Sequence, residues 1–224
     1  MAYPQAPWTL KGYALQTVHL IDVADARPLI PPELDIVSVF PGKTIGGVYL
    51  SYYGQSPVME YSELIVAPGM VSHSGKVGGW VSHIYVDNPD SVAGGREIWG
   101  LPKEMADFTW ERDDSSGSGY SDRVTVRQGE RTLCRLRYSQ QGLGLPLPLS
   151  FYGFSTQDSK LLAYKADLES RLGLVSSNLE IPSESPFGNL GLKQPWLTGH
   201  CKELRLVVNA PEVVQQRGAE FSYQ

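Results

Sequence analysis

The most informative residue in this chain is Lys103, which follows Gly100 and Pro102. The proline fixes its own backbone angle and restricts the residue before it, so the lysine side chain leaves a stiff frame in a set direction. A lysine amine in an enclosed site condenses with a carbonyl group to form a Schiff base, provided that the amine is neutral. An ordinary lysine amine is almost wholly protonated at neutral pH, so burial or a nearby cation must favour the neutral form. Lys103 is therefore a candidate nucleophile, and a solvated lysine after a loop is the alternative.

A second candidate is Glu63, which lies in the aliphatic and aromatic stretch of residues 59–66. The alternation of a strand places Tyr61 and Glu63 on one face and Glu60 on the other, so only one carboxylate enters a given interior. A carboxyl group that faces an apolar interior exchanges protons with a bound substrate or orients it. The alternative is that Glu63 faces solvent at the edge of a sheet.

Other chemistries find little support in the spacing of residues. The four histidines show no metal-ligand spacing, so no metal is predicted. Residues 75–79 are rich in glycine but lack the order of a P-loop, and no Gly-x-Gly-x-x-Gly follows a strand, so no nucleotide or other cofactor is predicted. The chain has no Gly-x-Ser-x-Gly elbow, which argues against a serine hydrolase. A net charge of -5 provides no basic field for nucleic acid or an anionic membrane.

The composition indicates one compact, turn-rich domain over residues 1–224. The chain has 23 glycines and 16 prolines, yet 42% of its residues are hydrophobic, which is too apolar for disorder and too turn-rich for a helical bundle. Cys134 and Cys201 form no Cys-x-x-Cys motif, so we expect reduced thiols. The first residues lack the features of a signal peptide, and no run of about 18 apolar residues occurs. We therefore expect a cytoplasmic protein without a membrane span.

Strand-like segments recur along the chain and must position Lys103 and Glu63. Two helices are predicted, a short one after Asp22 and a longer one from the N-cap Asn88 to Trp99. Residues 142–148, rich in glycine, proline and leucine, are interpreted as a linker. The strands that we predict cover residues 13–21, 34–40, 46–53, 59–66, 79–86, 107–112, 122–128, 131–138 and 204–209. Their spacing favours an antiparallel sheet or barrel.

The segment around Lys103 resembles the acetoacetate decarboxylase superfamily. In that family a Gly-Arg-Glu sequence precedes a Pro-Lys whose lysine forms the Schiff base, and here these are residues 95–97 and 102–103. Ser62-Glu63 is similar to the segment of the family's active-site glutamate. The resemblance covers about residues 7–140. It implies a mainly β fold with minor α content, a closed antiparallel β-barrel or cone with flanking strands, no cofactor, and a homo-oligomer.

The chain also departs from the decarboxylase pattern. The decarboxylases carry a second lysine directly after the first, which is credited with keeping the first neutral, whereas this chain has Glu104. A carboxylate close to the amine stabilises its ammonium form. The family's arginine near the first strand falls close to Gly12, and its second active-site glutamate falls near Val48. Acetoacetate itself is therefore not implied as the substrate.

A likeness over most of the chain is to the plant neoxanthin-deficiency proteins, a branch of this superfamily needed for a carotenoid to accumulate. The similar segments include residues 12–20, 62–66 and 100–102. Two functions remain open, beside a third reading as an assembly protein, which the tendency of this superfamily to form homo-oligomers suggests. The first is a lyase that acts on a small oxo acid through a Schiff base on Lys103. The alternative is a non-catalytic barrel that binds an apolar, isoprenoid or carotenoid-related molecule.

In the lyase hypothesis each candidate residue has a role. Lys103 is the catalytic amine and Glu63 positions the substrate or moves a proton. Tyr61, Arg96 and Glu104 are further candidates for the pocket.

Overall fold

The fold consists of two β-sheets and little helix, as the sequence predicts. The computed structural model describes residues 3–54, 56–112, 121–139 and 142–216. The larger sheet has twelve strands, in the order β2-β5-β6-β12-β13-β15-β1-β3-β4-β7-β8, with β16 also paired to β13. Its strands are β1 (Trp8–Asp22), β2 (Asp35–Ile36), β3 (Lys43–Tyr53), β4 (Tyr61–Ala67), β5 (Met70–His73), β6 (Lys76–Trp80), β7 (His83–Val86), β8 (Lys103–Met105), β12 (Leu145–Gln157), β13 (Lys160–Leu174), β15 (Leu197–Val208) and β16 (Glu212–Gln216).

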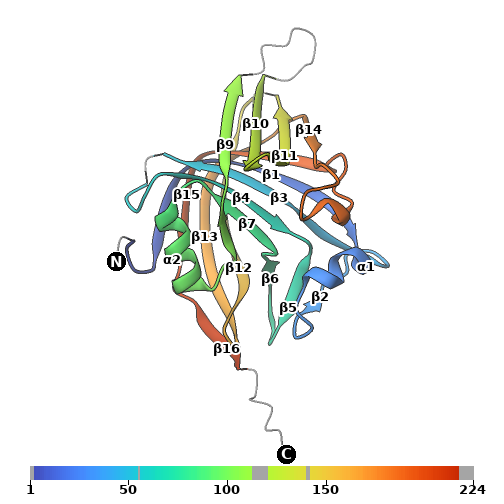
Figure 1. The fold of residues 1–224 in the computed structure, drawn as a ribbon, viewed down its shortest axis with the longest axis vertical. Coiled ribbons are helices and arrows are strands. Elements are labelled where there is room, and N and C mark those ends of the chain that lie inside the picture. The colour runs from blue at the N-terminus through green and yellow to red at the C-terminus, as the bar shows by residue number, and fades with distance from the viewer. Residues whose placement is uncertain (1–2, 55, 113–120, 140–141, 217–224) are drawn as a thin grey trace, which may run out of the picture.

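The smaller sheet has four strands in the order β14-β11-β10-β9 and projects from one end of the molecule (Figure 1). Its strands are β9 (Asp107–Arg112), β10 (Asp122–Gln128), β11 (Arg131–Tyr138) and β14 (Ser177–Glu180). The helical elements are α1 (Val23–Ala26), η1 (Arg27–Leu29), α2 (Pro89–Trp99) and η2 (Gly188–Leu190). Within the described ranges no helix has both the length and the hydropathy needed to cross a membrane.

The expectation of a closed barrel is wrong. The larger sheet stays open, since β2 and β8 are the end strands of its pairing order and do not pair with each other. Closure needs a continuous ladder between the first and last strands. Here β2 has two residues and β8 has three, and β8 is already paired in parallel with β7. Strands this short do not supply a closing ladder.

Most of the predicted strands are confirmed, and β9, β10 and β11 have the predicted bounds. The linker predicted at residues 142–148 is wrong, because β12 begins at Leu145 and pairs with β13 along its whole length. Pro146 and Pro148 are tolerated because this part of β12 has β13 on one side only, while β6 joins the other side at residues 152–154. The sequence does not reveal the start of β12, because its prolines lie where one side of the strand is unpaired.

The helix α2 begins and ends as the sequence predicts. The side chain of Asn88 accepts hydrogen bonds from the backbone N–H groups of Asp90 and Ser91, and Pro89 occupies the first turn. Gly100 ends the helix with a φ of 62°, a left-handed conformation that suits glycine. The chain then turns directly into β8, so α2 and Lys103 are fixed relative to each other.

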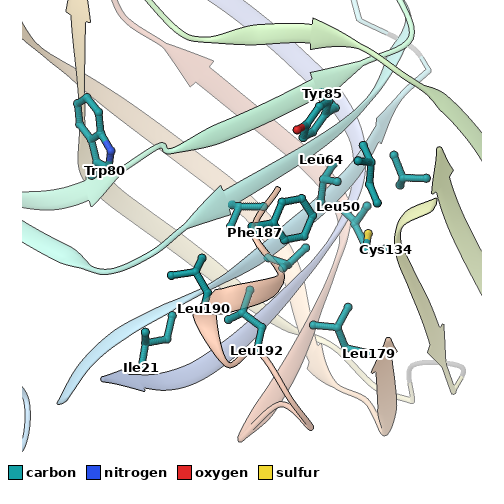
Figure 2. Close-up of a cluster of buried hydrophobic side chains, with 14 of the residues drawn as sticks. Ile21, Leu50, Leu64, Trp80, Tyr85, Cys134, Leu179, Phe187, Leu190 and Leu192 are labelled. Atoms are coloured by element: carbon teal, nitrogen blue, oxygen red, sulfur yellow. The ribbon is translucent and has the colours of Figure 1, made fainter. Parts of the chain in front are cut away.

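The main core lies between the larger sheet, the smaller sheet and the segment after β14. In Figure 2 Phe187 from that segment lies beside the cross-strand pair of Leu50 and Leu64, and Leu190 and Leu192 belong to the same cluster. Leu64 and Val66 of β4 belong to this core, which turns the odd-numbered residues, Glu63 among them, toward the opposite face. Because one face of β4 packs in the core, the carboxylate of Glu63 points to the other face.

Candidate active site

Lys103 and Glu63 meet inside the protein although 40 residues separate them in sequence. Lys103 Nζ lies 2.8 Å from Glu63 Oε1, and the two side chains are 4% and 5% exposed. The contact arises from strand order, because β7 pairs with β4 on one side and with β8 on the other. The alternative readings of a solvated lysine and a solvent-facing glutamate are therefore wrong.

A third residue completes the immediate surroundings of the amine. Lys103 Nζ also donates a hydrogen bond to Ser91 Oγ at 2.9 Å, and Ser91 is fully buried in the first turn of α2. Sequence reasoning missed Ser91. Its signal was the spacing of Ser91 and Gly95, two small residues four positions apart on one helix face.

Gly95 makes room for the lysine side chain. A Cβ atom added to Gly95 lies 2.5 Å from Lys103 Cδ and 2.7 Å from its Cε, closer than side-chain carbons approach. The glycine pair in α2 weakens the helix by its low propensity. At position 95 the glycine leaves space beside the helix, and the side chain of Lys103 passes through that space to reach Ser91 and Glu63.

Two of the predicted pocket residues lie outside the cavity. Arg96 Nε donates a hydrogen bond to the carbonyl oxygen of Lys103 at 2.8 Å, so it fixes the backbone that carries the amine. Glu104 is exposed and accepts a hydrogen bond from Gln128 Nε2 at 2.8 Å. Because neighbouring residues of a strand point to opposite sides, Lys103 faces inward while Glu104 faces solvent. Water and salt screen the charge of Glu104 from the buried amine.

A cavity of about 250 Å³ opens over Lys103. Tyr61, predicted as a pocket residue, lines it with its ring centre 5.0 Å from Lys103 Nζ, and the ring of Trp8 lies 5.8 Å from the same atom. Among the described residues of the lining, Lys103 and Glu63 are the only side chains that carry a formal charge at neutral pH. The remainder is mostly aromatic and aliphatic and includes Leu10, Tyr49, Ile65, Trp80, Val81, Ile84, Trp99, Phe151, Tyr152, Tyr164, Leu168 and Leu206.

Buried phenols support the carboxylate. Tyr53 donates a hydrogen bond to Glu63 Oε2 at 3.3 Å, and the hydroxyl groups of Tyr53 and Tyr49 are 3.1 Å apart. Burial raises the pKa of Tyr49, Tyr53 and Tyr61 above the ordinary value, so these phenols stay protonated and uncharged. Glu63 therefore has hydrogen-bond donors on both oxygens, which hold its position.

A larger and more open groove of about 690 Å³ lies elsewhere on the protein. It contains neither Lys103 nor Glu63, and its lining mixes both charge signs, including Lys11, Glu169 and Arg205. The smaller cavity holds a buried amine and a buried carboxylate within one hydrogen bond of each other, and we therefore place the candidate site there. In the part of the chain that the structure describes, no group of three metal-ligating side chains was found.

Known proteins resemble this chain in sequence and in fold. Protein NEOXANTHIN-DEFICIENT 1 from Solanum lycopersicum is 28% identical over an alignment of 278 positions, which covers 96% of this chain and 94% of the relative. A solved structure of acetoacetate decarboxylase superposes with a TM-score of 0.79 at 18% identity and covers 97% of this chain and 93% of its own. The enduracididine biosynthesis enzyme MppR, complexed with pyruvate, superposes with a TM-score of 0.68 at 16% identity, over 95% of this chain and 92% of its own.

These solved structures establish the likeness of fold, and the sequence match establishes the family. The profile of the family described as acetoacetate decarboxylase matches residues 1–162, a stretch that contains both Glu63 and Lys103. The resemblance expected from residues 95–103 is thus confirmed. Because the match extends over most of the chain, this protein belongs to the acetoacetate decarboxylase family.

Proposed function

We propose that this protein is a cofactor-independent lyase that forms a Schiff base on Lys103. The observation that carries the proposal is the position of Lys103 Nζ, which is held by Glu63 and Ser91 beside an apolar cavity. A buried ion pair contributes little to stability compared with apolar residues of the same volume. It does provide an amine and a proton acceptor in direct contact, which imine formation requires.

Glu63 moves the protons of the reaction. Its carboxylate takes a proton from the Lys103 ammonium, and the weakly polar cavity favours the resulting uncharged pair. The free amine adds to the carbonyl carbon of the substrate and gives a carbinolamine. Glu63 then returns the proton to the carbinolamine oxygen, and water leaves. The product is a protonated imine, which draws electrons from an adjacent carbon–carbon bond.

With an oxo acid whose carboxylate is β to the carbonyl, the imine accepts the electron pair released as carbon dioxide leaves. The enamine that forms takes up a proton at carbon, and hydrolysis of the imine restores Lys103. The likeness in fold to MppR, complexed with pyruvate, supports small oxo acids as the first substrate class to test. The family match supports the reaction type.

The experiment is reductive trapping. The protein is incubated with acetoacetate or pyruvate and cyanoborohydride, and the modified peptide is identified by mass spectrometry. An adduct on Lys103 that is absent from Lys103→Met, and unchanged in the exposed-lysine control Lys165→Met, supports the proposal. If a panel of oxo acids, ketones and aldehydes leaves no adduct on Lys103, the proposal is wrong.

The second candidate function is binding of an apolar molecule without chemistry. The aromatic lining of the cavity favours it, and the name of the tomato relative connects that protein with a carotenoid. An isoprenoid or carotenoid-related ligand belongs to this alternative. Equal affinity of Lys103→Ala and the unaltered protein for such a ligand, with no trapping on Lys103, distinguishes it from the lyase. The expected homo-oligomer and cytoplasmic location remain predictions.

A further inference from the structure

We infer that the cavity accepts an uncharged ketone or aldehyde with an apolar chain in preference to an oxo acid. The inference rests on the proposed function, because it takes Lys103 as the group that captures the carbonyl. It concerns the substrate class of that site, and three features of the lining carry it.

The first feature is the balance of charge. The described lining contains one cation, Lys103, and one anion, Glu63, which neutralise each other at a distance of 2.8 Å. When Lys103 becomes a protonated imine, it retains a single positive charge, so the site is neutral with an uncharged substrate. An oxo acid adds a carboxylate and leaves the site with an excess negative charge. Burying an unpaired charge in such surroundings is strongly unfavourable.

The second feature is the nature of the other polar groups near the amine. Ser91 offers a hydroxyl group beside the amine, and Tyr61 and Tyr164 line the cavity with phenols that burial keeps protonated. Hydroxyl groups donate hydrogen bonds to a neutral carbonyl or carbinolamine oxygen. They do not supply the bidentate, positively charged clamp with which proteins usually recognise a carboxylate.

The third feature is the apolar strand at the cavity. Phe151 lines the cavity and pairs across strands with Ala166, while Leu149 pairs with Leu168, and both of these partners also line it. Residues 149 and 151 therefore share the face of β12 that borders the cavity. Leu149 is 48% exposed and Phe151 is 40% exposed. This stretch of β12 is an apolar path from the cavity to the protein surface.

The size of the cavity makes this path useful. Its volume of about 250 Å³ equals the share of roughly eight water molecules in the liquid, at about 30 Å³ each. A carbonyl group and a short chain fill that space. A longer chain leaves along Phe151 and Leu149, where burial of its carbon atoms and of the two exposed side chains stabilises the complex.

The experiment compares two probes of equal carbon number, methyl hexyl ketone and α-oxooctanoate. Each is incubated with the full chain and cyanoborohydride, and the rate of labelling at Lys103 is measured by peptide mass spectrometry. We expect the ketone to label Lys103 at least about ten-fold faster, since an unpaired buried charge costs several kcal/mol. Equal or faster labelling by the oxo acid overturns the inference and leaves the proposed function standing. No labelling by the ketone, when acetoacetate or pyruvate does label Lys103, also overturns the inference, whereas no labelling by any carbonyl probe overturns the proposed function.

Two variants test the lining directly. Gln16 lines the cavity and is half-buried, so Gln16→Arg adds the missing cation, whereas Gln16→Met does not. Of these two variants, we expect only Gln16→Arg to shift the labelling preference toward α-oxooctanoate. Leu149→Asp should slow labelling by methyl hexyl ketone but not by acetone, which lacks the chain that would follow β12 from Phe151 to Leu149. The control Leu174→Asp changes an exposed leucine outside the lining and should affect neither probe. If the ratio of the labelling rates with the ketone and the oxo acid is the same in all four variants, the inference is wrong.

Discussion

Lys103 Nζ and Glu63 Oε1 form a buried ion pair at 2.8 Å, and β7 is the strand that joins their two strands. The pair brings an amine and a carboxylate together at a cavity that is otherwise without formal charge in its described lining. The two residues are held differently, because Glu63 lies on a strand that is paired on both sides, by β3 and β7, while Lys103 begins an edge strand. The amine therefore depends on α2, through Ser91 and Arg96, for its position.

Breaking the buried pair from either side should destabilise the fold. Lys103→Met and Glu63→Gln each leave an uncompensated group in the interior, and we expect each to lower the free energy of unfolding by about 3–5 kcal/mol. The double variant should recover most of that loss. Urea unfolding measures all three. The control Glu180→Gln breaks the exposed pair with Arg135 and should change stability by less than about 1 kcal/mol. Single variants as stable as the unaltered protein would contradict the buried pair.

A methyl group at Gly95 should displace the amine. In Gly95→Ala the new Cβ meets Lys103 Cδ and Cε, so the side chain must leave its present path between α2 and β8. We expect the rate of Schiff-base trapping to fall by at least about ten-fold, the equivalent of 1.4 kcal/mol. Gly142→Ala is the matched control, because an added Cβ there has no neighbour within 4 Å. An unchanged trapping rate in Gly95→Ala would show that the glycine does not position Lys103.

Removing the hydroxyl of Ser91 should slow imine formation more than it harms the fold. Ser91→Ala deletes one hydrogen bond to Lys103 Nζ, worth about 1.5–3 kcal/mol when the donor is charged. The amine keeps Glu63 as a partner but loses the second contact that orients it. Trapping rates and urea unfolding are measured together, with Ser91→Cys as a conservative replacement. If Ser91→Ala traps carbonyl probes as fast as the unaltered protein, Ser91 has no positioning role.

The protein should lose stability in mild acid. Burial lowers the pKa of His19 and of His200 to about 4, so both are neutral in the folded protein and charge more easily after unfolding. The unfolded chain then binds more protons between about pH 6.5 and 4, and stability falls as the pH falls through that window. The slope is at most about 1.4 kcal/mol per pH unit for each histidine. Urea unfolding across this range should show a smaller slope in His19→Gln and His200→Gln; equal slopes would contradict the assignment.

The cysteines should be inert in the folded state. Cys134 and Cys201 are both free and buried, and burial raises the pKa of Cys134 to about 12 and raises that of Cys201 as well. Thiolate is the reactive form of cysteine, so alkylation should be slow until the protein unfolds. Iodoacetamide labelling with and without urea measures this. Rapid labelling of either thiol in the native protein would show that the region opens locally.

The sequence predicted the two residues at the centre of the site because their signals are local. Gly100 and Pro102 mark the restricted backbone that precedes Lys103. Strand alternation places Tyr61 and Glu63 on the face opposite to that of Glu60. The residues that complete the site, Ser91 and Tyr53, depend on which elements pack together. Tyr53 lies on β3, which pairs with β4, and Ser91 lies on α2, which packs against β8, and a single sequence does not contain that packing.

The two errors in the predicted fold, the closed barrel and the linker, also concern the way in which strands assemble. The closed barrel was expected from a family resemblance and a count of strands, but closure depends on whether the end strands are long enough to pair. The linker at residues 142–148 was inferred from Pro146 and Pro148, which normally argue against a strand. Their compatibility with β12 follows from the missing neighbour on one side of that strand, which is a property of the assembled sheet.

The central claim is that Lys103 forms an imine, and exchange of the carbonyl oxygen tests it most directly. A ketone that condenses with an amine and is released by water exchanges its oxygen with the solvent, so methyl hexyl ketone or pyruvate incubated in heavy-oxygen water gains mass. The account predicts that the unaltered protein accelerates this exchange and that Lys103→Met does not, while Lys165→Met matches the unaltered protein. Equal exchange with Lys103→Met and the unaltered protein would contradict the assignment of Lys103 as the reacting amine.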